Sequence, residues 1–150
     1  MTATTTRWLL DVNVLLAVTW PKHMHHALAR QWFRAVPRRA WASCCVTQLG
    51  FVRLSSSVQF TADAVTPPQA ANLLQRWCQR TDHVWVPDLP LEEVPVFASP
   101  VLIGHRQVTD AYLLGLAEHH GLKLATLDRG LRQLGLDTAP GTVEWIGAAA

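Results

Sequence analysis

The stretch RWLLDVNVLLAV, residues 7 to 18, is an apolar run that contains two polar side chains, and it predicts the first strand and helix of the fold. Residues 7–10 have the length and apolar character of a short buried strand, and residues 13–19 begin a helix. Asp11 then lies where the strand ends, and either Asp11 or Asn13 can cap the helix with a side-chain oxygen. The stretch therefore predicts a strand-to-helix junction that contains a carboxylate.

Strand and helix patterns alternate along the rest of the chain. Periodicity predicts further strands at 40–44, 83–87, 122–126 and 143–147, and helices at 23–36, 47–56, 66–80, 109–121 and 129–135. The helix at 47–56 is expected to use Leu49, Val52 and Ser56 at helical spacing, and the helix at 109–121 to be capped by Thr109. The Pro-rich stretch 87–106 is expected to be a loop with a short helix around 91–97. This alternation predicts an α/β fold with a parallel central β-sheet flanked by α-helices, in one domain over 1–150 with its core at about 7–146.

Composition favours a folded, soluble protein. The chain has 150 residues, of which 49% are hydrophobic and 16% charged, so it can bury a substantial core. It contains no apolar run of the roughly 18 residues that a membrane span needs, and Asp11 and Asn13 interrupt the apolar stretch that a secretion signal would keep unbroken. The three cysteines form neither a disulfide framework nor a paired zinc motif, so we expect a cytoplasmic location and no membrane partner.

The net charge of +2 hides an uneven distribution along the chain. Residues 1–62 carry seven basic residues and one acid, a balance of +6, whereas residues 63–150 carry six basic residues and ten acids, a balance of −4. A cationic first half favours a polyanionic partner such as RNA, although a basic helix face is also compatible with plain solvation. The candidate RNA-backbone contacts are Arg30, Arg34, Arg38 and Arg39.

Three acidic residues stand at related places in the predicted elements. Asp11 and Asp128 each follow a strand, and Asp110 lies in the first turn of the clearest helix. Sites in open parallel sheets form outside the carboxyl ends of the strands, where the strand order reverses. Three carboxylates gathered there would repel one another unless a cation lay between them, and their oxygen ligands favour Mg²⁺ or Mn²⁺.

Each of these acids also has a purely structural explanation. Asp11 can simply cap a helix, Asp110 can interact favourably with a helix dipole, and Asp128 can be a turn residue. The shared placement of all three is what favours a common site.

Several segments of the sequence resemble one protein family. LLDVNVLLA, TQLGFVRLSS and GHRQVTDAYLLGLAEHHGLKLATLDRGL, with the spacing between them, are similar to the PIN-domain ribonucleases, specifically the VapC toxins of bacterial toxin–antitoxin pairs. The resemblance runs from about residue 7 to residue 146, and the block from His105 to Leu131 is its most specific part.

This resemblance implies a metal-dependent endoribonuclease. Asp11, Asp110 and Asp128 match the family's catalytic and metal-binding acids, and Asn13 and Thr109 match polar neighbours that position them. It also implies a Mg²⁺ or Mn²⁺ cofactor, a structured RNA substrate such as tRNA or rRNA, a homodimer, and a VapB-type antitoxin whose C-terminal segment covers the acidic groove.

The sequence departs from the family at Gln48, where many members have a glutamate. The site would then hold one negative charge fewer, so we expect one tightly bound ion and a second that arrives with the phosphate. Asp88, Glu92 or Glu93 can replace the missing charge, and the sequence does not choose among them. A catalytically weakened PIN-like module that binds RNA or protein is therefore the alternative function.

Overall fold

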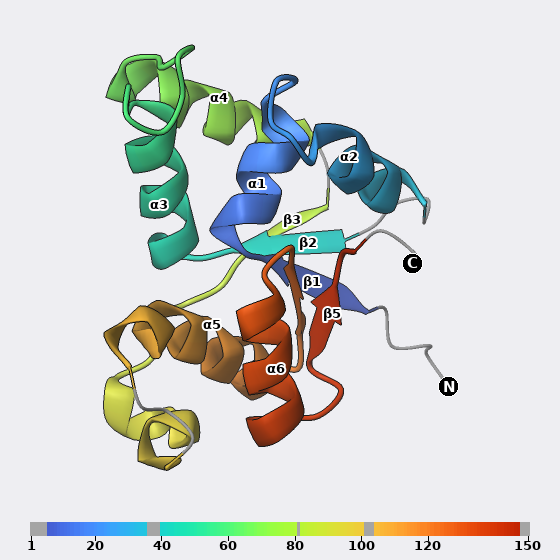
Figure 1. Cartoon of the computed structure of the whole chain (residues 1–150), viewed down its shortest axis with the longest axis vertical. Coiled ribbons are helices and arrows are strands. Elements are labelled where there is room, and N and C mark those ends of the chain that lie inside the picture. The colour runs from blue at the N-terminus through green and yellow to red at the C-terminus, as the bar shows by residue number, and fades with distance from the viewer. Residues whose placement is uncertain (1–5, 36–39, 81, 101–103, 148–150) are drawn as a thin grey trace.

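Five parallel strands form the central sheet of the protein. The computed structural model describes residues 6–35, 40–80, 82–100 and 104–147. The strands are β1 (Arg7–Leu10), β2 (Ala40–Ser43), β3 (His83–Trp85), β4 (Lys123–Thr126) and β5 (Val143–Trp145). They are hydrogen-bonded in the order β3-β2-β1-β4-β5, and every pairing is parallel (Figure 1). The predicted parallel α/β sheet is confirmed.

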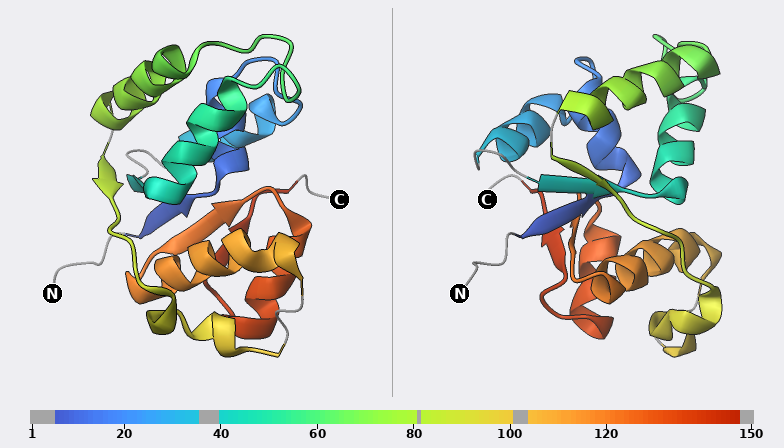
Figure 2. Two further views of the ribbon diagram at one scale, coloured as in Figure 1. Left: turned by 90° about the vertical axis from the view of Figure 1, so that its left-hand side faces the viewer. Right: turned by 180° about the vertical axis from the view of Figure 1, so that it is seen from behind.

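Helices cover both faces of this sheet, and Figures 1 and 2 show them in two separate layers. One layer contains α1 (Val12–Thr19), α2 (His26–Arg34), α3 (Cys45–Ser55) and α4 (Pro67–Arg80). The other contains α5 (Val108–His119) and α6 (Arg129–Thr138), with the 3-10 helices η1 (Leu91–Glu93), η2 (Pro95–Ala98) and η3 (His105–Gln107). None of the described helices combines the length and apolar character that a membrane crossing requires.

Side chains alternate between the two faces of the sheet, as the pleat of a β-strand requires. In β1, Leu9 packs into the core beneath α5 and α6, whereas Leu10 packs into the core beneath α1 and α3. Leu124 and Ala125 of β4 divide between the same two cores. Because the central strands are buried on both faces, they consist mainly of apolar residues.

The order of the strands reverses beside β1. The chain adds β2 and then β3 on one side of β1, and later adds β4 and then β5 on the other side. The reversal therefore falls between β1 and β4, which are direct neighbours. The residues that follow these two strands lie at the edge where parallel α/β sheets form their sites.

The structure corrects the expected face of α3. Leu49 is 64% exposed, whereas the side of α3 that faces the core carries Thr47, Gly50, Phe51 and Ser55. A Cβ added at Gly50 would lie 2.7 Å from a methyl group of Val12. The helix thus approaches α1 through small residues, which an expectation based on large apolar side chains misses.

The start of α5 also differs from expectation. Its N-cap is Gln107, because the 3-10 turn η3 leads directly into the helix and places Thr109 inside the first turn. The expected short helix around residues 91–97 is two 3-10 helices, η1 and η2, and α6 continues to Thr138 rather than ending at 135.

Replacing Gly115 of α5 with alanine is expected to destabilise the protein. The added Cβ would overlap Cγ1 of Val94, whose side chain is only 2% exposed and therefore has little room to move. Overpacking typically costs about 1–3 kcal/mol, which outweighs the gain of about 1 kcal/mol for alanine over glycine in a helix. Urea unfolding should show a net loss of about 1 kcal/mol.

The matched control is Gly104→Ala, because a Cβ at Gly104 meets nothing within 4 Å. This variant should stay within about 0.5 kcal/mol of the parent. A Gly115→Ala protein as stable as the parent would show that Val94 does not pack closely on α5.

Candidate active site

Asp11 is a buried carboxylate at the carboxyl end of β1. Its backbone N–H donates to the carbonyl of Ala125 in β4 at 3.0 Å, and its side chain caps α1 by accepting from the N–H of Val12 at 2.8 Å. Its other oxygen, Oδ2, accepts from the hydroxyl of Thr126 at 2.8 Å, and the residue is only 7% exposed. Burial raises the pKa of Asp11 despite these hydrogen bonds, and nearby Asp128 raises it further.

Asp128 follows β4 and begins α6 in the same way. Its Oδ1 accepts from the N–H of Gly130 at 2.7 Å and caps the helix. Its own backbone N–H donates to the hydroxyl oxygen of Thr126 at 3.0 Å. A single threonine hydroxyl thus connects the Asp11 carboxylate to the backbone of Asp128.

Asp110 is the third acid and has a different environment. It lies half-buried in the first turn of α5, and within the described residues its carboxylate accepts no hydrogen bond. Burial, followed by the negative charges of Asp11 and Asp128, raises the pKa of Asp110 to about 7. The two acids that follow β1 and β4 are therefore close enough to act on Asp110 electrostatically.

These three side chains suit a hard divalent cation. All their donor atoms are carboxylate oxygens, and a cation between them would relieve the repulsion and partner the Asp110 carboxylate. In the described ranges, however, no three His, Cys, Asp or Glu side chains already stand close enough to hold an ion. An ion with carboxylate ligands commonly completes its coordination shell with water, so the group fits an open site rather than a closed cage.

Two further polar residues hold the ends of β1 and β4 in place. The side-chain oxygen of Asn13 accepts from the N–H of Leu127 at 3.3 Å and joins α1 to the loop after β4. Thr126, which we did not select from the sequence, is fully buried and contacts both Asp11 and Asp128. The sequence does contain a signal for Thr126, because this hydroxyl residue ends an apolar strand two positions before an acid.

Comparisons with known proteins place the chain in a family. A family model described as PIN domain matches residues 8–136. Ribonuclease VapC38 of Mycobacterium tuberculosis (strain ATCC 25618 / H37Rv) is 40% identical over 124 residues, which cover 82% of this chain and 86% of VapC38. Ribonuclease VapC44 of Mycobacterium tuberculosis (strain CDC 1551 / Oshkosh) is 37% identical over 139 residues, which cover 92% of this chain and 95% of VapC44.

The chain belongs to the PIN domain family. The resemblance to VapC proteins noted in the sequence is confirmed, since both of these relatives are VapC proteins. The crystal structure of PAE2754 from Pyrobaculum aerophilum matches the fold of this PIN domain with a TM-score of 0.58 at 23% sequence identity, over 94% of this chain and 85% of that one.

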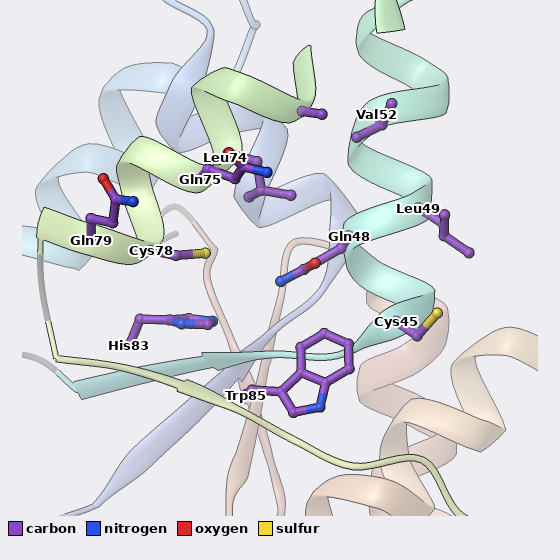
Figure 3. Close-up of a pocket in the computed structure, with 11 residues that line it drawn as sticks. Cys45, Gln48, Leu49, Val52, Leu74, Gln75, Cys78, Gln79, His83 and Trp85 are labelled. Atoms are coloured by element: carbon purple, nitrogen blue, oxygen red, sulfur yellow. The ribbon is translucent and has the colours of Figure 1, made fainter. Parts of the chain in front are cut away.

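Gln48 of this PIN domain lies in a groove between α3, α4 and β3 (Figure 3). Its amide nitrogen donates to the hydroxyl of Ser43 at 2.9 Å, and the same hydroxyl lies 2.7 Å from Nε2 of His83. Figure 3 shows the Gln48 side chain pointing toward His83 and Trp85. The structure therefore gives Gln48 a hydrogen-bond partner, the buried hydroxyl of Ser43 at the end of β2.

Among the described residues, no hydrogen bond or ion pair joins a proposed replacement acid to Asp11, Asp110 or Asp128. Asp88 accepts a hydrogen bond from the hydroxyl of Tyr112 at 3.2 Å, and Glu92 and Glu93 are exposed in η1. Of the acids in the described ranges, Asp11 and Asp128 are the ones whose negative charge raises the pKa of Asp110.

The basic residues proposed for RNA contacts lie away from the carboxylates. Arg30 and Arg34 are on α2, which ends at Arg34 shortly before the amino end of β2. The carboxylates lie at the opposite edge of the sheet, since they follow the carboxyl ends of β1 and β4. Arg38 and Arg39 lie outside the described residues.

The unfolding free energy of the metal-free protein is expected to depend on Asp110 as pH changes. The pKa of this group is about 7 in the folded protein and its ordinary value is 3.8, so between these values the folded state binds more protons than the unfolded chain. The contribution of Asp110 to stability must then fall as pH rises from about 4 to about 7. Asp110→Asn should remove this part of the pH dependence.

The measurement is denaturant unfolding across this pH range with a chelator present. Asp137→Asn, on the exposed surface of α6, is the matched control and should follow the parent curve. Parallel curves for the parent and Asp110→Asn would contradict the raised pKa.

Replacing Thr126 with valine removes the hydroxyl and nearly keeps the shape of the side chain, so it tests the role of the hydroxyl. Valine leaves the buried oxygen of Asp11 and the N–H of Asp128 without their shared partner, which typically costs about 1–3 kcal/mol. The pKa of Asp11 should rise further, because the lost hydrogen bond lowers it. Urea unfolding and NMR titration of the carboxyl groups measure the two effects.

The control is Thr126→Ser, which keeps the hydroxyl and should be much closer to the parent in stability. Equal stability of the Val and Ser variants would refute the bridging role.

Proposed function

We propose that this PIN domain is a divalent-metal-dependent endoribonuclease, the toxin of a toxin–antitoxin pair. The proposal is supported by VapC relatives named ribonucleases at 37–40% identity. The observation that carries it is Asp110, a half-buried carboxylate without a hydrogen-bond donor among the described residues and with a pKa raised to about 7 beside two other acids. Such a group is costly for folding and useful for binding a cation.

In this proposal Asp11, Asp110 and Asp128 hold Mg²⁺ or Mn²⁺. When bound, the ion supplies charge neutralisation at the scissile phosphate and lowers the pKa of water for the hydrolysis. Asp11 and Asp128 are oriented by Thr126 and by the N–H groups of α1 and α6. Asp110 carries a proton in part of the metal-free molecules at neutral pH and must release it when a cation binds. Cation affinity should therefore increase as pH rises through about 7.

The proposed substrate is a structured RNA such as tRNA or rRNA. Arg30 and Arg34 lie at the sheet edge opposite the carboxylates, so they would contact the backbone of a distant part of a folded RNA. Such contacts contribute salt-dependent affinity and do not read sequence. The proposed protein partners, by analogy with VapC proteins, are a second copy of the chain and a VapB-type antitoxin that covers the acidic groove.

The second candidate function is a catalytically weakened module that binds RNA or protein. The observation in its favour is Gln48, a neutral side chain that donates to the buried hydroxyl of Ser43. On this view Asp11 and Asp128 would retain a fold-stabilising role as helix caps.

An RNA-cleavage assay tests the proposed function. The parent protein in Mg²⁺ or Mn²⁺ should cleave folded RNA, and Asp11→Asn and Asp110→Asn should each lower the rate by more than about 100-fold, because even outer-shell partners of metal ligands contribute about 10- to 100-fold. Asp137→Asn on the surface of α6 is the control for the lost charge and should cleave at the parent rate.

Calorimetric titration with Mn²⁺ separates the two candidate functions. The endoribonuclease should bind the ion with release of protons near neutral pH, and Asp110→Asn should bind it more weakly. A parent that binds no divalent ion, alone or with RNA, would leave the binding module as the better account.

A further inference from the structure

Two arginines of α6 lie over one tryptophan at the carboxyl edge of the sheet. The guanidinium carbons of Arg129 and Arg132 are 5.5 and 4.7 Å from the centre of the Trp145 ring. Both arginines are exposed, whereas Trp145 is half-buried. These distances are typical of cation–π contacts, which restrain flexible arginine side chains.

The indole of Trp145 is itself fixed beside the acidic residues. Trp145 ends β5 opposite Thr126 in the register with β4, and its Nε1 donates to the carbonyl of Leu127 at 3.2 Å. The ring packs on the bare backbone of Gly147, where an added Cβ would overlap it. The ring of Trp145 is therefore anchored to the segment that runs from Thr126 to Asp128.

Both guanidinium groups carry uncompensated charge next to this segment. Arg129 directly follows Asp128, so the two Cα atoms are about 3.8 Å apart. In the described part of the chain neither Arg129 nor Arg132 forms an ion pair. The same end of α6 presents the positive end of its helix dipole.

The charge of the proposed active site requires such cations. Three ionised carboxylates outweigh the charge of a single divalent ion, and the phosphates of RNA are anionic as well. Two arginines beside Asp128 would reverse the sign of the local charge. A guanidinium stacked on a ring still directs its N–H groups outward, and this planar set of donors suits phosphate oxygens.

We propose that Arg129 and Arg132, positioned by Trp145, form the subsite for an RNA phosphate next to the scissile one. The proposal rests on the proposed function for the identity of the substrate. It differs from the contacts assigned to Arg30 and Arg34, because this cluster lies at the same sheet edge as the carboxylates. A short RNA that cannot reach the far edge should therefore depend on Arg132 and not on Arg34.

Binding of a labelled single-stranded RNA of about three nucleotides tests this subsite, with Asp110→Asn as the background to prevent cleavage. Arg132→Gln should weaken binding about tenfold and lower the slope of log K against log salt by about 0.7. Arg132→Lys should recover only part of the affinity, because lysine keeps the charge and lacks the planar donor set. Trp145→Leu should weaken binding without a change of charge.

Arg53→Gln is the matched control. Arg53 is an exposed arginine in the last turn of α3, a helix that begins at the carboxyl end of β2 and runs away from it. The variant loses the same charge and should bind the short RNA within about twofold of the background protein. Without the Asp110 substitution, Arg132→Gln should raise KM for the short RNA more than it lowers kcat.

The outcomes separate this subsite from the proposed function. If the parent cleaves RNA and Arg132→Gln binds and cleaves short RNA as the parent does, the subsite is overturned while the ribonuclease stands. If the parent never cleaves RNA but Arg132→Gln still weakens RNA binding, the two arginines stand as an RNA-phosphate site and the ribonuclease fails. Loss of affinity for an oligoglutamate peptide with unchanged affinity for RNA would overturn the subsite in favour of an acidic protein ligand.

Discussion

The hydrogen bonds of Thr126 join the ends of the two strands between which the sheet reverses its order. Its hydroxyl donates to the buried carboxylate of Asp11 and accepts from the backbone of Asp128. A carboxylate that is only 7% exposed is costly without such donors. The strand order, the caps of α1 and α6 and the position of two acids all converge on this hydroxyl, so the geometry of the acidic edge depends on it.

Local sequence patterns were sufficient for most of the framework. Short apolar runs predicted the strands, and Asp11 at the end of the first run predicted the junction that begins α1. The local patterns gave wrong predictions for features that depend on tertiary packing or on the preceding turn. Leu49 is exposed because α3 approaches α1 through Gly50, and Thr109 is not a cap because η3 runs directly into α5. Neither the helix partner nor the preceding 3-10 turn can be read from local periodicity.

The candidate site was predictable in its acids and less so in its surroundings. Spacing along the chain identified Asp11, Asp110 and Asp128, because each stands at the end or start of an element. It did not identify Thr126, whose role depends on the pairing of β1 with β4. It also directed attention to the basic first half of the chain, whereas Arg129 and Arg132 of the acidic half lie beside Asp128. The distribution of charge along a sequence does not show which basic side chains lie at the same edge of the sheet.

The three acids differ in how they are held. Asp11 and Asp128 are tied to each other through Thr126, so they must move together with the central strands. Asp110 belongs to α5, and within the described residues no hydrogen bond ties its carboxylate to the other two. A small slide of α5 along the sheet would therefore widen or narrow the gap in front of a rigid pair. In the proposed metal site, such an arrangement would fit ions of different radius by adjusting one helix, without breaking the hydrogen bonds of Thr126.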